Sequence, residues 1–240
     1  MASPDEQERR VVAVLLVPAT LLLLASDLLF DAVRYRHGTF IPRFADLVSV
    51  GAGKAGLFRL AGLTDMLGSY LLPLPATVYL WRVLRPSKPL VVDLIALAGV
   101  GFGLIGGAAA AALSFGGSSL IRSYAAAGPG ARPAIASTFA SLDGALTSGV
   151  WQSFNGVLLA VWLVGLALVL RRRWRWFAAY SAVLGVAGVL GSLGLLAGQE
   201  YASSAPETVV FLPLNVWLAW LAFLLWRGAP AALSAGRSTV

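Results

Sequence analysis

Six long stretches of apolar residues, separated by shorter polar or charged segments, make up most of the chain. They lie at about residues 11–33, 60–84, 90–115, 149–170, 177–198 and 208–226. A helix of about 20 apolar residues is long enough to cross the hydrocarbon core of a bilayer. The pattern therefore predicts an all-α fold, a polytopic membrane protein in which residues 11–228 form a six-transmembrane-helix bundle. Residues 1–10 and 229–240 are a polar leader and a polar tail outside this domain.

Two of the connections are longer than the others, and both fall on the same side of a six-span bundle. Residues 34–59 mix apolar and cationic side chains, which is typical of a segment that lies in the membrane interface. Residues 116–148 contain turn signals around Gly128-Pro129-Gly130. After this turn, apolar residues at helical spacing predict a surface helix that leads directly into the fourth stretch; they are Ile135, Phe139, Leu142 and Leu146.

Prolines and small residues give two of the stretches additional features. Pro73 and Pro75 interrupt the second stretch near its middle, because proline lacks the N–H that continues a helix. In the third stretch, small residues recur at every fourth position and allow another helix to approach closely; they are Gly99, Gly103, Gly107 and Ala111. We expect this stripe to pack within the chain rather than against a second copy.

Cationic residues set the predicted orientation. Arginines and lysines cluster after the second and fourth stretches, Arg227 follows the sixth, and Arg9 and Arg10 precede the first. Because positive residues in short loops mark the cytoplasmic face, both termini are predicted to be cytoplasmic and the two longer connections extracytoplasmic. Four indoles fall at the same predicted interface, as in an aromatic belt: Trp81, Trp174, Trp176 and Trp226.

Composition narrows the functional classes. Of the 240 residues, 58% are hydrophobic and only 12% are charged, against about 25% charged in soluble domains. The net charge of +7 is explained by cytoplasmic loops, so no nucleic-acid partner is expected. The absence of cysteine excludes a disulfide framework and a cysteine nucleophile, and a single histidine leaves too few ligands for a haem. The sequence therefore predicts no cofactor and no metal site.

Seven polar residues within or beside the predicted spans are candidate ligand-binding residues, and most lie toward the outer face: Asp27, Asp31, Arg34, Asp65, Gln152, Asn155 and Asn215. Groups of this kind rarely face lipid, so we expect them to converge inside the bundle. Two interpretations stay open. The residues are structural pairs that hold helices together, or they line an outward-facing polar pocket that receives a ligand or a proton.

Other polar motifs point to structural roles. Asp93, near the cytoplasmic end of the third stretch, is expected to pair with Arg82, Arg85 or Lys88. The segment Gly51-Ala52-Gly53-Lys54-Ala55-Gly56 lacks the spacing and the Ser or Thr of a phosphate-binding loop. No serine-hydrolase or zinc-protease motif is present, so catalysis would have to use acidic residues such as the Asp27–Asp31 pair.

Several short blocks, taken in order, resemble a known family. Gly56-Leu57-Phe58-Arg59-Leu60 leads into the second stretch, which ends in Tyr79-Leu80-Trp81-Arg82-Val83-Leu84-Arg85-Pro86. The sixth runs from Asn215-Val216-Trp217-Leu218 to Leu225-Trp226-Arg227-Gly228. The order resembles a bacterial family of six-span membrane proteins, the domain of unknown function "forty-three eighty-six", over about Val11 to Gly228. The resemblance implies six spans in a bacterial cytoplasmic (inner) membrane. It carries over no catalytic residue, because the family has no established activity.

Three functional hypotheses result. The first is a non-enzymatic membrane protein: an accessory or scaffolding subunit that self-associates or binds a membrane-protein partner, or a binder of a small or lipid-like ligand in the outward-facing polar pocket. The second is a small proton- or ion-coupled transporter. Prolines within spans favour it, because carriers use broken helices, whereas the lack of a clear internal repeat argues against it. The third is an intramembrane enzyme that uses acidic residues. Membrane lipid is a partner in all three.

Overall fold

The computed structural model describes residues 4–36, 39–41, 43–196 and 207–228, and nearly all of them are helical. This confirms the predicted all-α fold; one antiparallel pair of two-residue strands is the exception. The predicted tail and nearly all of the predicted fifth connection lie outside the described residues, whereas residues 4–10 of the predicted leader are described and form the first turns of α1. The elements are α1 (Pro4–Arg34), β1 (Tyr35–Arg36), β2 (Thr39–Phe40), η1 (Phe44–Ser49), α2 (Ala52–Asp65), η2 (Met66–Leu71), α3 (Leu74–Leu84), η3 (Arg85–Ser87), α4 (Pro89–Ala126), α5 (Arg132–Asp143), η4 (Gly144–Asn155), α6 (Gly156–Leu170), α7 (Arg175–Leu196) and α8 (Glu207–Trp226).

Four helical segments are long and apolar enough to cross a membrane: Asp5–Arg34, Pro89–Ala126, Arg132–Leu170 and Arg175–Gly194. A shorter apolar helix is Phe211–Trp226. The second predicted stretch is divided between α2–η2 and α3, so it contributes no single long helix. These segments confirm a helical protein of membrane type with four candidate spans among the described residues.

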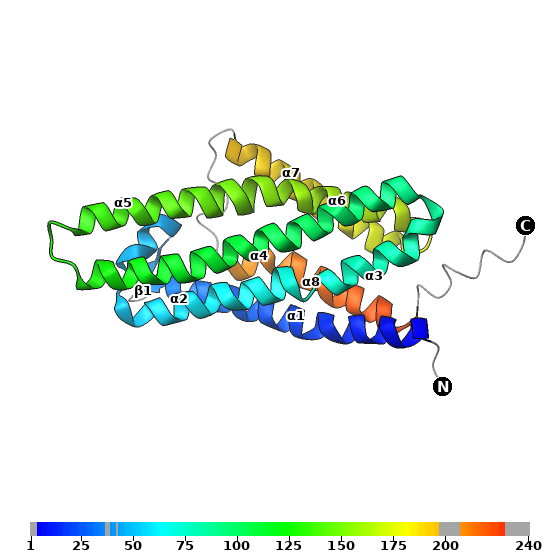
Figure 1. The fold of residues 1–240 in the computed structure, drawn as a ribbon, viewed down its shortest axis with the longest axis horizontal. Coiled ribbons are helices and arrows are strands. Elements are labelled where there is room, and N and C mark those ends of the chain that lie inside the picture. The colour runs from blue at the N-terminus through cyan, green and yellow to red at the C-terminus, as the bar shows by residue number, and fades with distance from the viewer. Residues whose placement is uncertain (1–3, 37–38, 42, 197–206, 229–240) are drawn as a thin grey trace, which may run out of the picture.

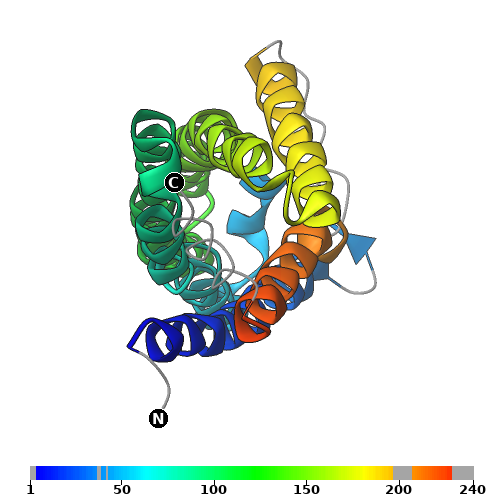
Figure 2. The same ribbon diagram turned by 90° about the vertical axis from the view of Figure 1, so that its right-hand side faces the viewer.

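The helices form a ring in chain order. Viewed along the bundle, α1 is followed by the α2–η2–α3 segment, then α4, α6, α7 and α8 (Figure 2). Each helix packs against its neighbour in sequence, and α8 packs along α1 to close the ring. We call the end where α1 begins and α8 ends the proximal end, and the end with the α4–α5 turn the distal end (Figure 1).

The second stretch is broken where the prolines predict it. The helix changes to a π-helix over η2 and stops at Leu72, whose N–H donates to Leu67 O at 3.0 Å. A new helix, α3, starts after Pro73, which is one of the positions where a missing N–H costs nothing. By contrast, α1 and α8 stay helical across Pro18 and Pro213.

The two segments expected to be long connections are largely helical, and the helices extend further than the partly helical segment and the single surface helix that the sequence predicts. Helix α4 has 38 residues and continues past Phe115 to Ala126. After a short turn, α5, η4 and α6 return as one helical segment, so that α4 and α5 lie side by side as a hairpin at the distal end (Figure 1). Most of the connection between α1 and the second stretch is also helical, as η1 and α2.

A separate hydrophobic core explains this helical extension. At the distal end, Phe58 of α2 packs edge-on against Phe30 of α1, with ring centroids 5.8 Å apart. Phe44 of η1 lies 5.7 Å from Phe58, and Phe139 of α5 lies 6.2 Å from it. Phe58 and Phe139 are fully buried. These contacts bury apolar faces of five elements, so the distal segments have a core of their own.

Aromatic side chains fill the proximal part of the ring. Trp162 of α6 meets Trp217 of α8 edge-on at 5.2 Å, and Phe177 of α7 stacks on Trp217 at 5.4 Å. The small residues of α4 face this core and the second stretch: a Cβ at Gly99 would lie 2.7 Å from Trp162 Nε1, and one at Gly103 would lie 2.5 Å from a Leu74 methyl carbon. The predicted packing of this stripe within the chain is confirmed.

Candidate functional site

Two polar centres are buried between helices in the part of the bundle toward the distal end. In the first, which we call the Asp27–Asn215 centre, Asn215 Nδ2 of α8 donates a hydrogen bond to Asp27 Oδ2 of α1 at 3.0 Å. Asp27 is 3% exposed and Asn215 is 5% exposed. The sequence predicted that the polar candidates would converge inside the bundle without pairing these two residues, which lie 188 positions apart; the ring closure by α8 brings them together.

The amide of Asn215 is only half satisfied by the described residues. Its Nδ2 also lies 3.3 Å from Phe211 O, whereas its Oδ1 is buried and accepts no hydrogen bond there. Buried polar atoms in proteins are nearly always hydrogen-bonded to protein or to water, so each exception needs an explanation. A carboxylate beside an amide oxygen offers two acceptors, which complements a ligand that donates hydrogen bonds or carries positive charge.

The other charged candidates of α1 lie at its distal end. Asp31 is 9% exposed and Arg34 is 1% exposed. Arg34 Nε donates to Ile41 O at 3.0 Å, and the N–H of Ile41 donates to Arg34 O at 2.9 Å, so Arg34 fastens the β1–β2 turn. Lys54 Nζ donates to the carbonyls at the end of α1, Ala32 O at 2.7 Å among them. A cation there satisfies free carbonyls and the helix dipole, a role that sequence analysis missed.

The second centre, which we call the Tyr70–Asn155 centre, lies where η2, α4 and η4 meet. Asn155 is 1% exposed, and its Nδ2 donates to Phe102 O of α4 at 3.2 Å. Trp151 Nε1 donates to Gly106 O at 3.1 Å, and the Trp151 ring stacks on Tyr70 with centroids 6.5 Å apart. As at Asn215, the Oδ1 of Asn155 is buried and accepts no hydrogen bond from the described residues.

Gly106 makes this arrangement sterically feasible. A Cβ there would lie 2.1 Å from Tyr70 Cε1 and 2.3 Å from Asn155 Nδ2. No side chain larger than hydrogen therefore fits between the tyrosine ring and the amide. Gly106 falls outside the every-fourth-residue stripe of α4, so the spacing of small residues gave no indication of its role.

Both helices that face Gly106 are π-helical at this level. The π-helix η2 contains Tyr70, and the longer π-helix η4 contains Trp151 and Asn155. π-Helices are rare, mostly single turns, and frequently occur at functional sites. Here two π-helices lie opposite the same glycine of α4. The backbone geometry at the Tyr70–Asn155 centre therefore differs from that of the α-helices in the rest of the bundle.

The remaining candidates are not all in these two centres. Asp65 accepts a hydrogen bond from Ser69 Oγ and acts electrostatically on the Tyr70 hydroxyl, so it belongs with the second centre. Gln152 contacts α7 through its backbone, where its carbonyl accepts a hydrogen bond from Ser192 Oγ at 2.7 Å. The Gln152 side chain makes no hydrogen bond to the residues that the structure describes.

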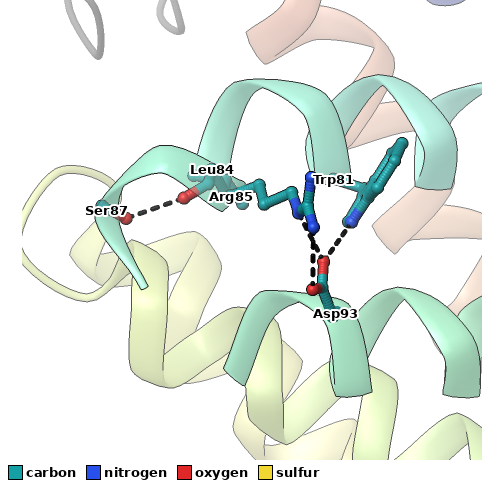
Figure 3. Close-up of polar contacts among 5 residues, drawn as sticks. All are labelled: Trp81, Leu84, Arg85, Ser87 and Asp93. Carbon is teal, nitrogen blue, oxygen red and sulfur yellow. Dashed lines mark hydrogen bonds and ion pairs between the residues drawn. The ribbon is translucent and has the colours of Figure 1, made fainter. Parts of the chain in front are cut away.

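A third carboxylate provides a contrast at the proximal end. Asp93 of α4 accepts hydrogen bonds from Arg85 Nε at 2.9 Å and from Trp81 Nε1 at 2.6 Å (Figure 3). The Asp93 side chain is 39% exposed and that of Arg85 is 52% exposed. The predicted pairing of Asp93 with a neighbouring cation is confirmed, and it is a solvated ion pair rather than a buried centre.

The chemistry available in the two buried centres is that of acceptors and aromatic rings. Within the described ranges there is no group of three or more His, Cys, Asp or Glu side chains that could hold a metal ion. No model of a protein family matches the chain, and no curated protein or solved structure is significantly similar to it. The resemblance to the six-span bacterial family therefore stays a prediction, and the function has to be argued from the two centres themselves.

Proposed function

We propose that the chain crosses a bacterial cytoplasmic membrane six times, with both termini in the cytoplasm. The four long apolar segments supply four crossings, and the α2–η2–α3 segment and α8 supply the other two. Pairs of arginine and aromatic rings support boundaries at both ends. Proximally, Arg10 lies 5.9 Å from the Trp226 ring and Arg85 lies 5.3 Å from Trp81, while distally Arg59 lies 4.2 Å from Phe115.

The spacing of these boundaries fits a bilayer. Asp93, which pairs with Trp81 and Arg85, precedes Phe115 by 22 residues on the same helix (115 − 93). At about 1.5 Å per residue this is about 33 Å, close to the roughly 30 Å of a hydrocarbon core. The segments beyond Phe115 and the distal phenylalanine core then project from the outer surface of the membrane.

Thiol labelling tests this orientation, because the chain has no cysteine of its own. Ser87→Cys places a thiol at the proximal end and Ser123→Cys places one at the distal end; both residues are exposed. In intact cells, a membrane-impermeant maleimide should label Ser123→Cys, and Ser87→Cys should react only after lysis. Labelling of both variants from the same side would contradict the six-span arrangement.

Within this framework we propose that the protein is non-enzymatic and binds a ligand in its outer half at the Asp27–Asn215 centre. The observation that supports this is the buried Asp27 carboxylate beside an Asn215 oxygen that has no donor among the described residues. A carboxylate in a membrane helix costs about 2.5–3.5 kcal/mol on insertion scales at mid-bilayer, and such residues are rare and often mark ligand or ion sites. The ligand is one that donates hydrogen bonds or carries positive charge.

Mass spectrometry of the intact protein tests the ligand proposal. The protein is extracted in nanodiscs made directly from cell membranes, and its mass is compared with that of Asp27→Asn and Asp93→Asn. An added mass should be retained by the wild type and by Asp93→Asn, whose solvated carboxylate is the control, and lost by Asp27→Asn. Equal retention by Asp27→Asn would contradict the proposal. A companion subunit at fixed ratio, unaffected by Asp27→Asn, would instead support an accessory role.

A small proton- or ion-coupled transporter is the second candidate function. The broken second span favours it, because η2 interrupts the helix between Asp65 and Pro73, and carriers often bind their coupling ion at discontinuous helices. Proteoliposomes that contain a trapped pH-sensitive dye provide the test. A transporter should dissipate an imposed pH gradient, and Asp65→Asn should stop it while Asp93→Asn does not. Flux equal to that of empty vesicles would exclude proton coupling.

A further inference from the structure

A second buried polar atom on η4 lacks a partner among the described residues. Besides Asn155 Oδ1, this is the hydroxyl of Thr147, two turns earlier on the same π-helix. Both atoms are buried, so neither is in contact with bulk solvent at the protein surface. Each such atom needs an explanation of its own, because buried polar atoms are nearly always hydrogen-bonded.

Other hydroxyl groups on helices of this bundle show what Thr147 is missing. Each of three threonines donates to the carbonyl four residues earlier: Thr20 to Leu16 O at 2.9 Å, Thr64 to Leu60 O at 3.0 Å, and Thr138 to Ala134 O at 3.0 Å. Thr138 is on α5, directly before η4. In the π-helix the carbonyls are turned relative to an α-helix, and Ser153 correspondingly donates to the carbonyl five residues earlier, Ser148 O, at 2.7 Å. The Thr147 hydroxyl therefore needs a partner that the helix does not supply.

The polar positions of η4 form a line into the bundle. Thr147, Trp151 and Asn155 of η4 follow Asp143, the last residue of α5, at every fourth position. A π-helix turns more slowly than an α-helix, which keeps residues four apart nearly in register. Trp151 and Asn155 both donate to carbonyls of α4, so this line faces the interior. At its outer end, Leu142 lies against Gly116 of α4, one residue past the Phe115 that marks the proposed membrane surface.

We propose that water enters the bundle from the outer surface along this face of η4 as far as Trp151, and that Trp151 separates it from the Tyr70–Asn155 centre. Buried waters typically make about three hydrogen bonds to polar groups that are otherwise unsatisfied, which is the need of the Thr147 hydroxyl. The Trp151 indole lies between Thr147 and Asn155, held by its hydrogen bond to Gly106 O and by stacking on Tyr70. The proposal rests on the membrane orientation proposed above, in which the distal end of the bundle faces outward. Only small, hydrated solutes would pass along this route.

Cysteine accessibility tests this route in the full-length protein, since no native cysteine interferes. The probe is a small anionic methanethiosulfonate added to right-side-out membrane vesicles. Ser137→Cys, exposed on α5, is the positive control, and Val157→Cys, whose exposed side chain faces lipid on α6, is the negative control. Thr147→Cys should react at a rate close to that of Ser137→Cys, although Thr147 is only partly exposed and its hydroxyl is buried. A rate no higher than that of Val157→Cys would overturn the proposed water route.

The role of Trp151 has its own measurement. Asn155→Cys should stay unmodified in the otherwise unchanged chain and should react once Trp151→Ala is added. Reaction of Asn155→Cys with Trp151 in place would show that the indole does not separate the two regions and would overturn that part. Full labelling of every variant in denaturing detergent confirms that each thiol is present. None of these labelling rates depends on Asp27. If the water route is disproved, the proposed ligand site at the Asp27–Asn215 centre can still be tested separately.

Discussion

Two asparagine side chains are buried in the described part of the chain, and their amides lie in different surroundings. Asn215 and Asn155 each use their nitrogen to reach a neighbouring helix, and each keeps a buried oxygen without a donor among the described residues. Beside Asn215 there is the Asp27 carboxylate, between two α-helical segments. Beside Asn155 there are the rings of Tyr70 and Trp151, between two π-helical segments.

This difference assigns the two centres different physical tasks. At the Asp27–Asn215 centre, electrostatics dominates, because a charge removed from water must be compensated by partners nearby. At the Tyr70–Asn155 centre, packing dominates, because the amide and the ring approach each other only through the space left by Gly106. The Asp27–Asn215 centre should therefore be sensitive to loss of a hydrogen-bond partner, and the Tyr70–Asn155 centre should be sensitive to an increase in side-chain volume.

The largest expected effect comes from Asn215→Leu. It removes the amide donor from the Asp27 carboxylate, and a hydrogen bond to a charged group contributes about 1.5–3 kcal/mol. Asn155→Leu is the matched change at the other centre, where no charge depends on the amide, and about 1 kcal/mol is expected. Unfolding of both variants in mixed micelles of increasing SDS content measures the difference. Equal losses would remove the electrostatic distinction between the centres.

The next largest effect is expected from Gly106→Ala. The added methyl group would overlap Tyr70 and Asn155, and overpacking of this kind costs about 1–3 kcal/mol. Gly107→Ala is the control on the adjacent position, where a Cβ would meet its nearest neighbours at 3.5 Å, an ordinary contact distance. The same unfolding measurement should show a clear loss for Gly106→Ala and little change for Gly107→Ala. The reverse order would disprove the packing account.

A smaller effect is expected from Trp151→Phe. The ring that stacks on Tyr70 is retained in part, and the hydrogen bond from Nε1 to Gly106 O is lost, at a cost of about 1 kcal/mol. Tryptophan fluorescence would not isolate this residue among eight, so the stability measurement is combined with amide hydrogen exchange of residues 144–155. Faster exchange confined to η4 is expected, and unchanged exchange would show that the indole does not hold the π-helix.

The smallest effect is expected from Asp93→Asn. The Asp93–Arg85 ion pair is solvated, and ion pairs of this kind contribute little to stability. The unfolding midpoint should stay close to that of the wild type, and the residual difference should disappear in high salt, which screens exposed charges. A loss of stability as large as that of Asn215→Leu would mean that the difference in burial between Asp93 and Asp27 does not determine how much each carboxylate contributes to stability.

The sequence predicted the helical fold, the break at Pro73 and the Asp93 pairing because each depends on local chemistry. It also predicted the helix around Phe139, which lies in α5. It missed the continuation of α4, because Gly116 and Gly117 resemble a loop. In the folded chain, Gly117 is small for another reason: a Cβ there would lie 2.6 Å from the Phe58 ring. Small residues that make room for a distant aromatic ring cannot be distinguished from turn residues without knowing that the ring is there.

The candidate sites were predicted in part. That the polar candidates would face the interior followed from the cost of exposing polar groups to lipid, but the contact between Asp27 and Asn215 did not. The Tyr70–Asn155 centre depends on two π-helices, and no periodicity of apolar residues indicates them in η2 or η4. The roles of Gly106, Thr147 and Lys54 likewise depend on which helix lies opposite each of them. Whether the seven candidates bind a ligand stays a prediction.

Closure of the ring by α8 has a consequence for how the protein is made. Asn215, one partner of Asp27, is encoded 188 residues later, so at about 5–20 residues per second a ribosome needs roughly 10–40 s to supply it. During that interval the first helix resides in the insertion machinery or the bilayer with an acidic group that has not yet met Asn215. Biogenesis of this protein therefore has a defined late step, in which the final helix joins the first.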